Sequence, residues 1–112
     1  MEVVNFLKKA KEMTKLFEYH LLSKVNDHTF TIVKAENRTL DFHVHPSCEE
    51  AFYVVEGSMK IEFRDRMVVL ADGDMLVVPK GTEHRPVIES LVTCLVIALE
   101  DSTKDSPKLK AE

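Results

Sequence analysis

The fold is decided by the stretch HVHPSCEEAFYVVEG at residues 43–57. His43 and His45 are two residues apart, so on a β-strand both imidazoles would point to the same face. Pro46 cannot donate a hydrogen bond to a neighbouring strand, so this strand is expected to stop there. A short connection then leads to Glu50 at the start of the next strand. The carboxylate is therefore predicted to return beside the two imidazoles.

A second stretch, GDMLVVPKGTEH at residues 73–84, supplies a third imidazole. It ends in His84, which follows the turn Pro79-Lys80-Gly81. Three imidazoles and one carboxylate suit a divalent transition metal, and ligand type alone does not distinguish Fe, Mn, Co, Ni, Cu and Zn. Four protein ligands leave positions open for substrate, water or dioxygen on a five- or six-coordinate ion. We predict one metal site, with the ligands His43, His45, Glu50 and His84.

The two stretches together resemble the two motifs of the cupin family. Eight of the ten fixed positions match, including the four predicted ligands and the glycines and proline that set the spacing. Asn37 stands in place of the first motif's opening glycine, and Ile88 in place of the second motif's closing asparagine. Asparagine tolerates a left-handed backbone, so Asn37 can still form a turn. The change at Ile88 affects a local hydrogen bond rather than the metal. The resemblance covers residues 28–100 and implies an all-β fold, an antiparallel cupin jelly-roll barrel.

The neighbours of the predicted ligands leave some alternatives open. Glu49 could replace Glu50, because the family allows three or four residues after the H-x-H pair, but only Glu50 has the family spacing to the next glycine. Cys48 is close enough in sequence to border the site, and its thiol is expected to be a bystander. If Glu50 points inward, Phe52 and Val54 share its face. These two side chains are predicted to form an apolar pocket around the metal.

The rest of the chain predicts one domain made mainly of strands. Apolar residues three and four apart over residues 3–17 predict a short amphipathic N-terminal helix, and residues 1–18 are expected to pack on the barrel. The barrel is expected to span residues 19–100, and the polar residues 101–112 to form a tail. Alternating runs between turn residues predict strands at residues 19–25, 28–35, 39–45, 50–57, 58–63, 67–71, 75–78 and 91–99.

Composition limits the partners and the compartment. The net charge of −4 argues against nucleic-acid binding. No apolar run approaches the ~20 residues of a membrane span, and the N-terminus lacks a signal peptide, so a soluble cytoplasmic protein is expected. Cys48 and Cys94 are then expected to be free thiols. Strands such as residues 91–99 are apolar on both faces, so their outer face is expected to be covered by a second subunit or by the N-terminal helix, and we predict a homodimer.

Fold alone does not select a reaction. Cupins include dioxygenases, isomerases, epimerases, decarboxylases and non-catalytic binders, so the resemblance implies a small-molecule ligand without naming it. We expect a metal-dependent enzyme acting on a small oxygen-bearing molecule, of the dioxygenase or isomerase type. The alternative is a non-catalytic module that binds or senses a small molecule or a metal. It is favoured by the shortage of acid–base groups: Tyr53 should face away from Glu50, and Glu83 and Arg85 flank His84 near the rim.

Overall fold

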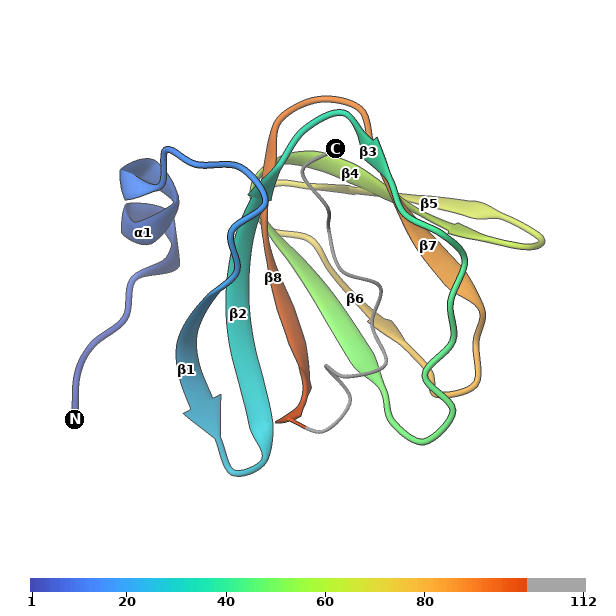
Figure 1. Ribbon diagram of the computed structural model, residues 1–112, viewed down its shortest axis with the longest axis horizontal. Helices are drawn as coiled ribbons and strands as arrows, with labels where there is room; N and C mark the ends of the chain where they lie inside the picture. The colour runs from blue at the N-terminus through green and yellow to red at the C-terminus, as the bar shows by residue number, and fades with distance from the viewer. Residues whose placement is uncertain (101–112) are drawn as a thin grey trace.

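The computed structural model describes residues 1–100, so the predicted tail at residues 101–112 lies outside the described part (Figure 1). Among the described residues, no helix is long and apolar enough to span a bilayer. The elements are α1 (Phe6–Glu12), β1 (His20–Val25), β2 (His28–Ala35), β3 (Arg38–Thr39), β4 (Glu50–Phe63), β5 (Met67–Ala71), β6 (Met75–Val78), β7 (His84–Ile88) and β8 (Val92–Leu99).

The strands form two antiparallel sheets that share β4 (Figure 1). Sheet A contains β1, β2, β8, the first half of β4 and β6. Sheet B contains β3, β7, the second half of β4 and β5. The strand order β1-β2-β8-β4-β7-β3 leaves its two end strands unpaired with each other, so the sheet is not closed into a barrel. The predicted jelly roll is confirmed: the two sheets are connected through β4 and pack face to face, without hydrogen bonds between the end strands β1 and β3.

β4 bends from sheet A into sheet B at Gly57. This residue has φ +101°, in the region that favours glycine. The pairing of β4 with β8 also shifts register between Val54 and Glu56, and a bulge of this kind bends a strand. A Cβ at Gly57 would overlap the carbonyl oxygen of Leu91 in the turn before β8, so only glycine allows this close approach. The two strands predicted on either side of Gly57 are therefore one continuous strand.

Two asparagines form left-handed turns. Asn37 has φ 56°, which confirms that asparagine can replace the motif's glycine at this turn. Asn26 has φ 52° in the turn that joins β1 to β2. Ile88, at the motif's other unusual position, is buried in the core at the end of β7. Its side chain therefore contributes packing where the family motif has a polar group.

Around the second half of the site, one predicted strand is shorter than expected and one strand was missed. The strand predicted at residues 39–45 is reduced to β3 and one isolated bridge at His43, because the register against β7 shifts by one residue between Thr39 and His43. β7 is missing from the predicted strands; it contains Pro86, which cannot donate a hydrogen bond and is uncommon inside a strand. The carbonyl of Pro86 nevertheless accepts a hydrogen bond from the N–H of Leu40 at 3.1 Å.

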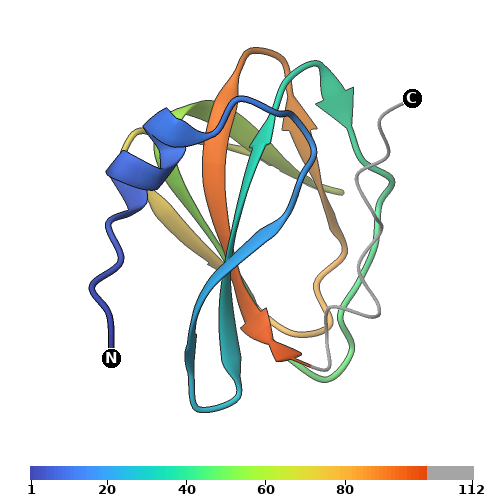
Figure 2. The same ribbon diagram turned by 60° about the vertical axis from the view of Figure 1, so that its left-hand side comes forward.

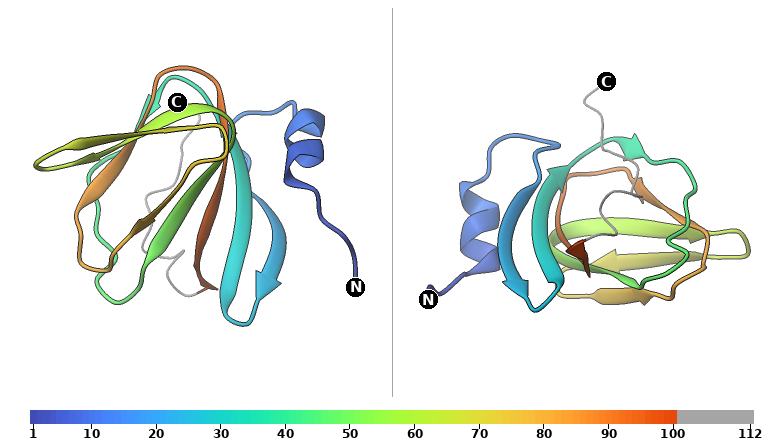
Figure 3. Two further views of the ribbon diagram at one scale, coloured as in Figure 1. Left: turned by 180° about the vertical axis from the view of Figure 1, so that it is seen from behind. Right: turned by 60° about the horizontal axis from the view of Figure 1, so that its bottom comes forward.

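The main core fills the space between the two sheets, and α1 lies outside it against sheet A (Figures 2 and 3). The helix is shorter than predicted, because Asn5 caps it at the start and the backbone at Met13 is extended. Ala10 and Met13 pack with Ile32 and Leu95 on the outer face of sheet A. The main core consists of Val33, Ala35, Phe52, Val54, Met59, Ile61, Phe63, Leu70, Val78, Ile88, Val92 and Cys94.

Candidate metal centre

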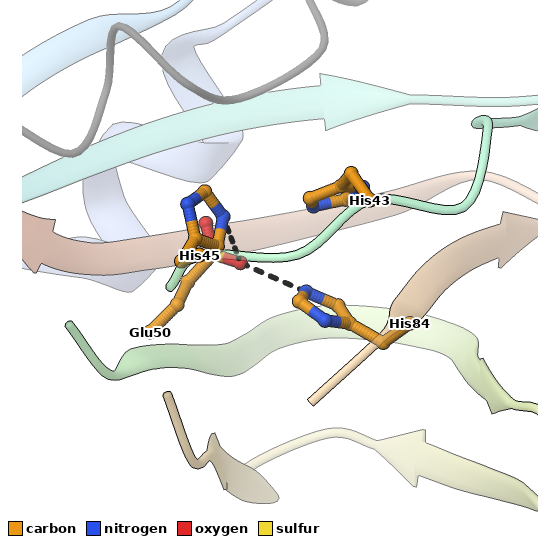
Figure 4. A group of neighbouring side chains, drawn as sticks. All are labelled: His43, His45, Glu50 and His84. Atoms are coloured by element: carbon orange, nitrogen blue, oxygen red, sulfur yellow. Dashed lines mark hydrogen bonds and ion pairs between the residues drawn. The ribbon is translucent and has the colours of Figure 1, made fainter. Parts of the chain in front are cut away.

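The four predicted ligands lie together at the end of the interior where β4 and β7 begin (Figure 4). His43 and His45 come from the segment between β3 and β4, Glu50 is the first residue of β4, and His84 is the first residue of β7. One nitrogen or oxygen atom from each of the four residues lies within 4.8 Å of the others. His45, Glu50 and His84 are buried, and His43 is partly exposed. Glu49, the alternative carboxylate, is exposed.

Backbone hydrogen bonds connect the two halves of the site. His43 and His84 form an antiparallel bridge, in which the N–H of His43 donates to the carbonyl of His84 at 2.9 Å and the reverse bond is 3.0 Å. Side chains paired in this way lie on the same face, and the two ring centroids are 4.4 Å apart. The N–H of Gly81 donates to the carbonyl of His45 at 2.8 Å. The predicted Pro79-Lys80-Gly81 turn therefore holds His45 as well as leading to His84.

Two of the imidazoles have their tautomers set by backbone carbonyls. Nδ1 of His43 lies 3.1 Å from the carbonyl of Asp41, and Nδ1 of His84 lies 2.9 Å from the carbonyl of Thr82. A carbonyl oxygen only accepts hydrogen bonds, so Nδ1 carries the proton in each ring. Nε2 is then the nitrogen on the side of the other predicted ligands, and in His84 it lies 3.1 Å from Oε1 of Glu50. This pattern, in which the second ring nitrogen donates to a carbonyl, is typical of metal-binding histidines.

The hydrogen bonding of the His45 imidazole shows whether the site suits a metal ion. Both of its ring nitrogens are buried and have no hydrogen-bond partner among the described residues. Its Nε2 is 3.3 Å from Oε1 of Glu50, which is within ion-pair distance but is not a hydrogen bond in this geometry. Leaving a buried polar atom unpaired costs free energy. A metal ion would give Nε2 a partner, so the donor set fits a borderline divalent ion.

The pKa values of His43 and His84 shift in opposite directions. Burial lowers the pKa of His43, and the hydrogen bond to Asp41 offsets only part of that effect. Burial also acts to lower the pKa of His84, but its hydrogen bonds to Glu50, at 3.1 Å, and to Thr82 outweigh burial and raise the pKa. His43 is therefore more readily available as a neutral ligand. Because the pKa of His84 is raised, a metal ion competes with a proton for this imidazole up to a higher pH than at an unperturbed histidine.

Aromatic and aliphatic side chains border the ligands. Phe52 and Val54 are buried on the same face as Glu50, and the Phe52 ring centroid is 6.0 Å from that of His84. Phe63 lies at 6.4 Å from the same imidazole and was not among the predicted pocket residues. Alternation starting from Glu50 places odd-numbered residues outside. The bulge in β4 reverses this alternation, so Phe63 in the second half of the strand faces inward.

The two cysteines are buried free thiols, as predicted. Burial, with a smaller contribution from the charge of Glu50, raises the pKa of Cys94 to about 12. A thiol with this pKa stays protonated near neutral pH and is a poor metal ligand. Cys94 therefore belongs to the core and not to the ligand set. Cys48 lies in the connection between His45 and Glu50, where the sequence places it.

None of the three candidate acid–base residues faces the interior. Tyr53 points away from Glu50, as predicted, and its ring lies 6.5 Å from that of Phe6 in α1. Glu83 accepts a hydrogen bond from Nε of Arg64 at 2.7 Å. Arg85 donates from Nε to Glu62 at 2.8 Å. Glu83 and Arg85 therefore form ion pairs on the outside of sheet B.

Comparison with known proteins agrees with this architecture. The family model described as "Cupin domain" matches residues 29–99. The uncharacterized protein YdbB of Bacillus subtilis is 38% identical over 82 residues, which are 72% of each chain. The 3-hydroxyanthranilate 3,4-dioxygenase of Pyricularia oryzae is 33% identical over 66 residues, which are 55% of this chain and 35% of that protein.

Solved structures show the same fold. A cupin-2 domain containing protein from Shewanella frigidimarina has a TM-score of 0.78 and 34% identity, over 85% of this chain and 92% of that one. Protein NMB1881 from Neisseria meningitidis has a TM-score of 0.74 and 25% identity, over 88% and 99% of the two chains. With the family match, the jelly roll and the gathered motif residues, this chain belongs to the cupin family.

Proposed function

We propose that the protein is a metal-dependent enzyme that acts on a small oxygen-bearing molecule, in a reaction of the dioxygenase or isomerase type. His43, His45, Glu50 and His84 would hold one divalent transition metal ion. The observation that carries the proposal is the side chain of His45, whose two ring nitrogens are buried without a hydrogen-bond partner beside three other potential ligands. A structural role in an apolar core does not account for that arrangement.

When bound, the ion would supply a Lewis acid with positions open to substrate or dioxygen. Glu50 would contribute a negative charge that partly neutralises the ion in this buried site. The carbonyls of Asp41 and Thr82 hold two imidazoles with Nε2 toward the centre. Phe52 and Phe63 border the ligands with apolar surface, which limits water and favours a substrate that is partly apolar.

The similarity to a dioxygenase supports this reaction class. The aligned region is 33% identical to the 3-hydroxyanthranilate 3,4-dioxygenase of Pyricularia oryzae, and this chain spans about a third of that protein. The shared region favours metal-dependent chemistry on dioxygen over simple storage of a metal.

The test is anaerobic reconstitution of tag-free protein with Fe(II), Mn(II), Ni(II) or Zn(II). Oxygen uptake would be followed with 3-hydroxyanthranilate and other aminophenols and catechols, and isomerisation with small hydroxy ketones. We expect turnover with at least one metal, and its loss in Glu50→Gln. Glu49→Gln is the matched control, because Glu49 is the exposed neighbour of the buried ligand. Absence of turnover with every metal and substrate would count against the enzyme.

The second candidate is a non-catalytic module that binds or senses a small molecule. It is favoured by the positions of Tyr53, Glu83 and Arg85, since none of them offers an acid or base to the interior. Calorimetry of the metal-loaded protein with the same compounds separates the two functions. Tight binding with no chemical change in the recovered compound would support the binding module.

A further inference from the structure

The backbone bridge between His43 and His84 separates the candidate metal site on its inner side from a second group of side chains on its outer side. His43 and His84 face inward from this bridge, and Phe63 on β4 is the register partner of His84. The residues next to them in the chain, Phe42 and Arg85, point to the other side, where their side chains contact each other. The position of each imidazole is therefore linked through the backbone to a contact outside the site.

The outer contact is a cluster that we call the Phe42 clamp, made of Phe42, Arg64, Arg85, Glu62 and Glu83. The guanidinium carbon of Arg64 lies 3.8 Å from the Phe42 ring centroid, and that of Arg85 lies at 4.5 Å. Each guanidinium is held by a carboxylate. Arg64 donates from Nε and Nη2 to the two oxygens of Glu83 at 2.7 and 3.2 Å, and Arg85 donates from Nε to Glu62 at 2.8 Å. Both cations are thereby oriented toward one aromatic ring.

The segment that carries His43 has little other support. β3 ends at Thr39, and from there to β4 the chain is held by the two-bond bridge at His43 and by single backbone bonds at Leu40 and His45. His43 is also the least buried of the four ligands. The Arg64–Glu83 pair is exposed, and exposed ion pairs contribute little to overall stability, so this pair is poorly explained as a means of stabilising the fold. The contacts of the clamp with Phe42 are better explained as holding the segment that carries His43 in place.

We propose that Phe42 and the two guanidinium groups are positioning residues, which hold His43 at the distance and angle needed for metal binding. This inference rests on the proposed metal centre. Residues outside the ligand shell that orient a metal-binding histidine change metal affinity by about 10- to 100-fold when they are replaced. The clamp acts on one ligand of four, so we expect an effect at the lower end of that range.

The first measurement is the rate of Co²⁺ release to an excess of chelator, with the visible absorption spectrum of bound Co²⁺ recorded beforehand. Phe42→Ala removes both cation–π contacts, and we expect release about tenfold faster than in the wild type, with an altered spectrum. Phe42→Tyr keeps an aromatic ring and should release Co²⁺ at nearly the wild-type rate. Arg64→Ala changes only an exposed side chain and should accelerate release to a smaller extent, which provides a test if Phe42→Ala does not fold.

Arg38→Ala is the matched control. Arg38 lies over the ring of Phe17 at 4.5 Å and pairs with the far end of β7, so its loss removes a similar contact without touching Phe42. We expect wild-type release from this variant. Wild-type release rates and spectra in both Phe42→Ala and Arg64→Ala would overturn the proposal, as would equal acceleration in Arg38→Ala.

A readout in the metal-free protein separates this inference from the metal site itself. The amide hydrogens of His43 and His84 form the bridge, and their exchange with solvent can be followed by NMR. We expect faster exchange of both amides in Phe42→Ala, and wild-type exchange in Arg38→Ala. If the wild type binds no Co²⁺ while these amides respond as expected, the metal centre fails and the positioning of His43 stands. Unchanged exchange in Phe42→Ala would overturn the positioning role.

Discussion

Replacing Gly57 with alanine tests the bend in β4 that joins the half of the strand carrying Glu50 to the half that pairs with β7. Two costs can be separated. The first is the backbone conformation, since φ +101° is disfavoured for any residue with a Cβ and costs about 1–3 kcal/mol. The second is the overlap of the new Cβ with the carbonyl oxygen of Leu91 and its position 3.0 Å from the Cα of Val92. Both are backbone atoms, so β8 itself would have to move.

Gly73→Ala isolates the first cost. Gly73 also has a positive φ, of 84°, but a Cβ there would meet nothing within 4 Å. Displacing β8 in the Gly57 variant would strain or break a buried backbone hydrogen bond, which adds about 1–3 kcal/mol. We therefore expect Gly57→Ala to be less stable than Gly73→Ala by about 1–3 kcal/mol, out of a total stability of about 5–15 kcal/mol for a domain of this kind.

The assay is thermal and urea unfolding of the metal-free proteins followed by circular dichroism, because the chain has no tryptophan. At about 4 °C or more per kcal/mol, the Tm of Gly57→Ala should lie at least a few degrees below that of Gly73→Ala. Equal Tm values for the two variants would refute the close approach of β4 and the start of β8. A large loss in Gly73→Ala would show instead that the backbone conformation is the greater cost.

The other predictions concern pH, thiol chemistry and assembly. The pKa of His84 is raised in the folded protein, so its proton stabilises the metal-free protein below the unfolded pKa of about 6.5. That stabilisation is lost as pH rises through the folded pKa, which urea unfolding at several pH values can check. Metal affinity should increase over the same pH range, which metal titration can check. With a pKa of about 12, Cys94 should resist iodoacetamide at pH 8 until the protein unfolds, which mass spectrometry can detect. The predicted homodimer should sediment at twice the chain mass, and aspartate in place of the exposed Met75 and Val77 should give a monomer if sheet A forms the interface.

The grouping of the four candidate ligands could be predicted because motif spacing and strand alternation act over a few residues. His43 and His45 are two apart, and the spacing from Glu50 to the next glycine separated Glu50 from Glu49. In the structure Glu50 is buried and lies with the three histidines, whereas Glu49 is exposed. The turn at Asn37 followed from the tolerance of asparagine for a left-handed backbone.

What the sequence did not predict depends on register and on contacts between distant segments. The bulge near Gly57 reverses the alternation of β4, so Phe63 could not be placed by counting from Glu50. The strand β7 contains Pro86, whose missing N–H argues against a strand when the partner is unknown. The contact of Phe42 with Arg64 joins two segments that are brought together only by the pairing of β4 with β7 and the bridge at His43.

The most direct test is the metal content of the protein purified without chelators or a histidine tag. Elemental analysis of the wild type should find close to one transition-metal ion per chain. His84→Ala should lose most of it, because the variant removes one of four ligands, and Glu49→Gln should retain it. A wild type that binds no transition metal even after reconstitution, or a His84→Ala variant with unchanged occupancy, would contradict a metal centre at His43, His45, Glu50 and His84.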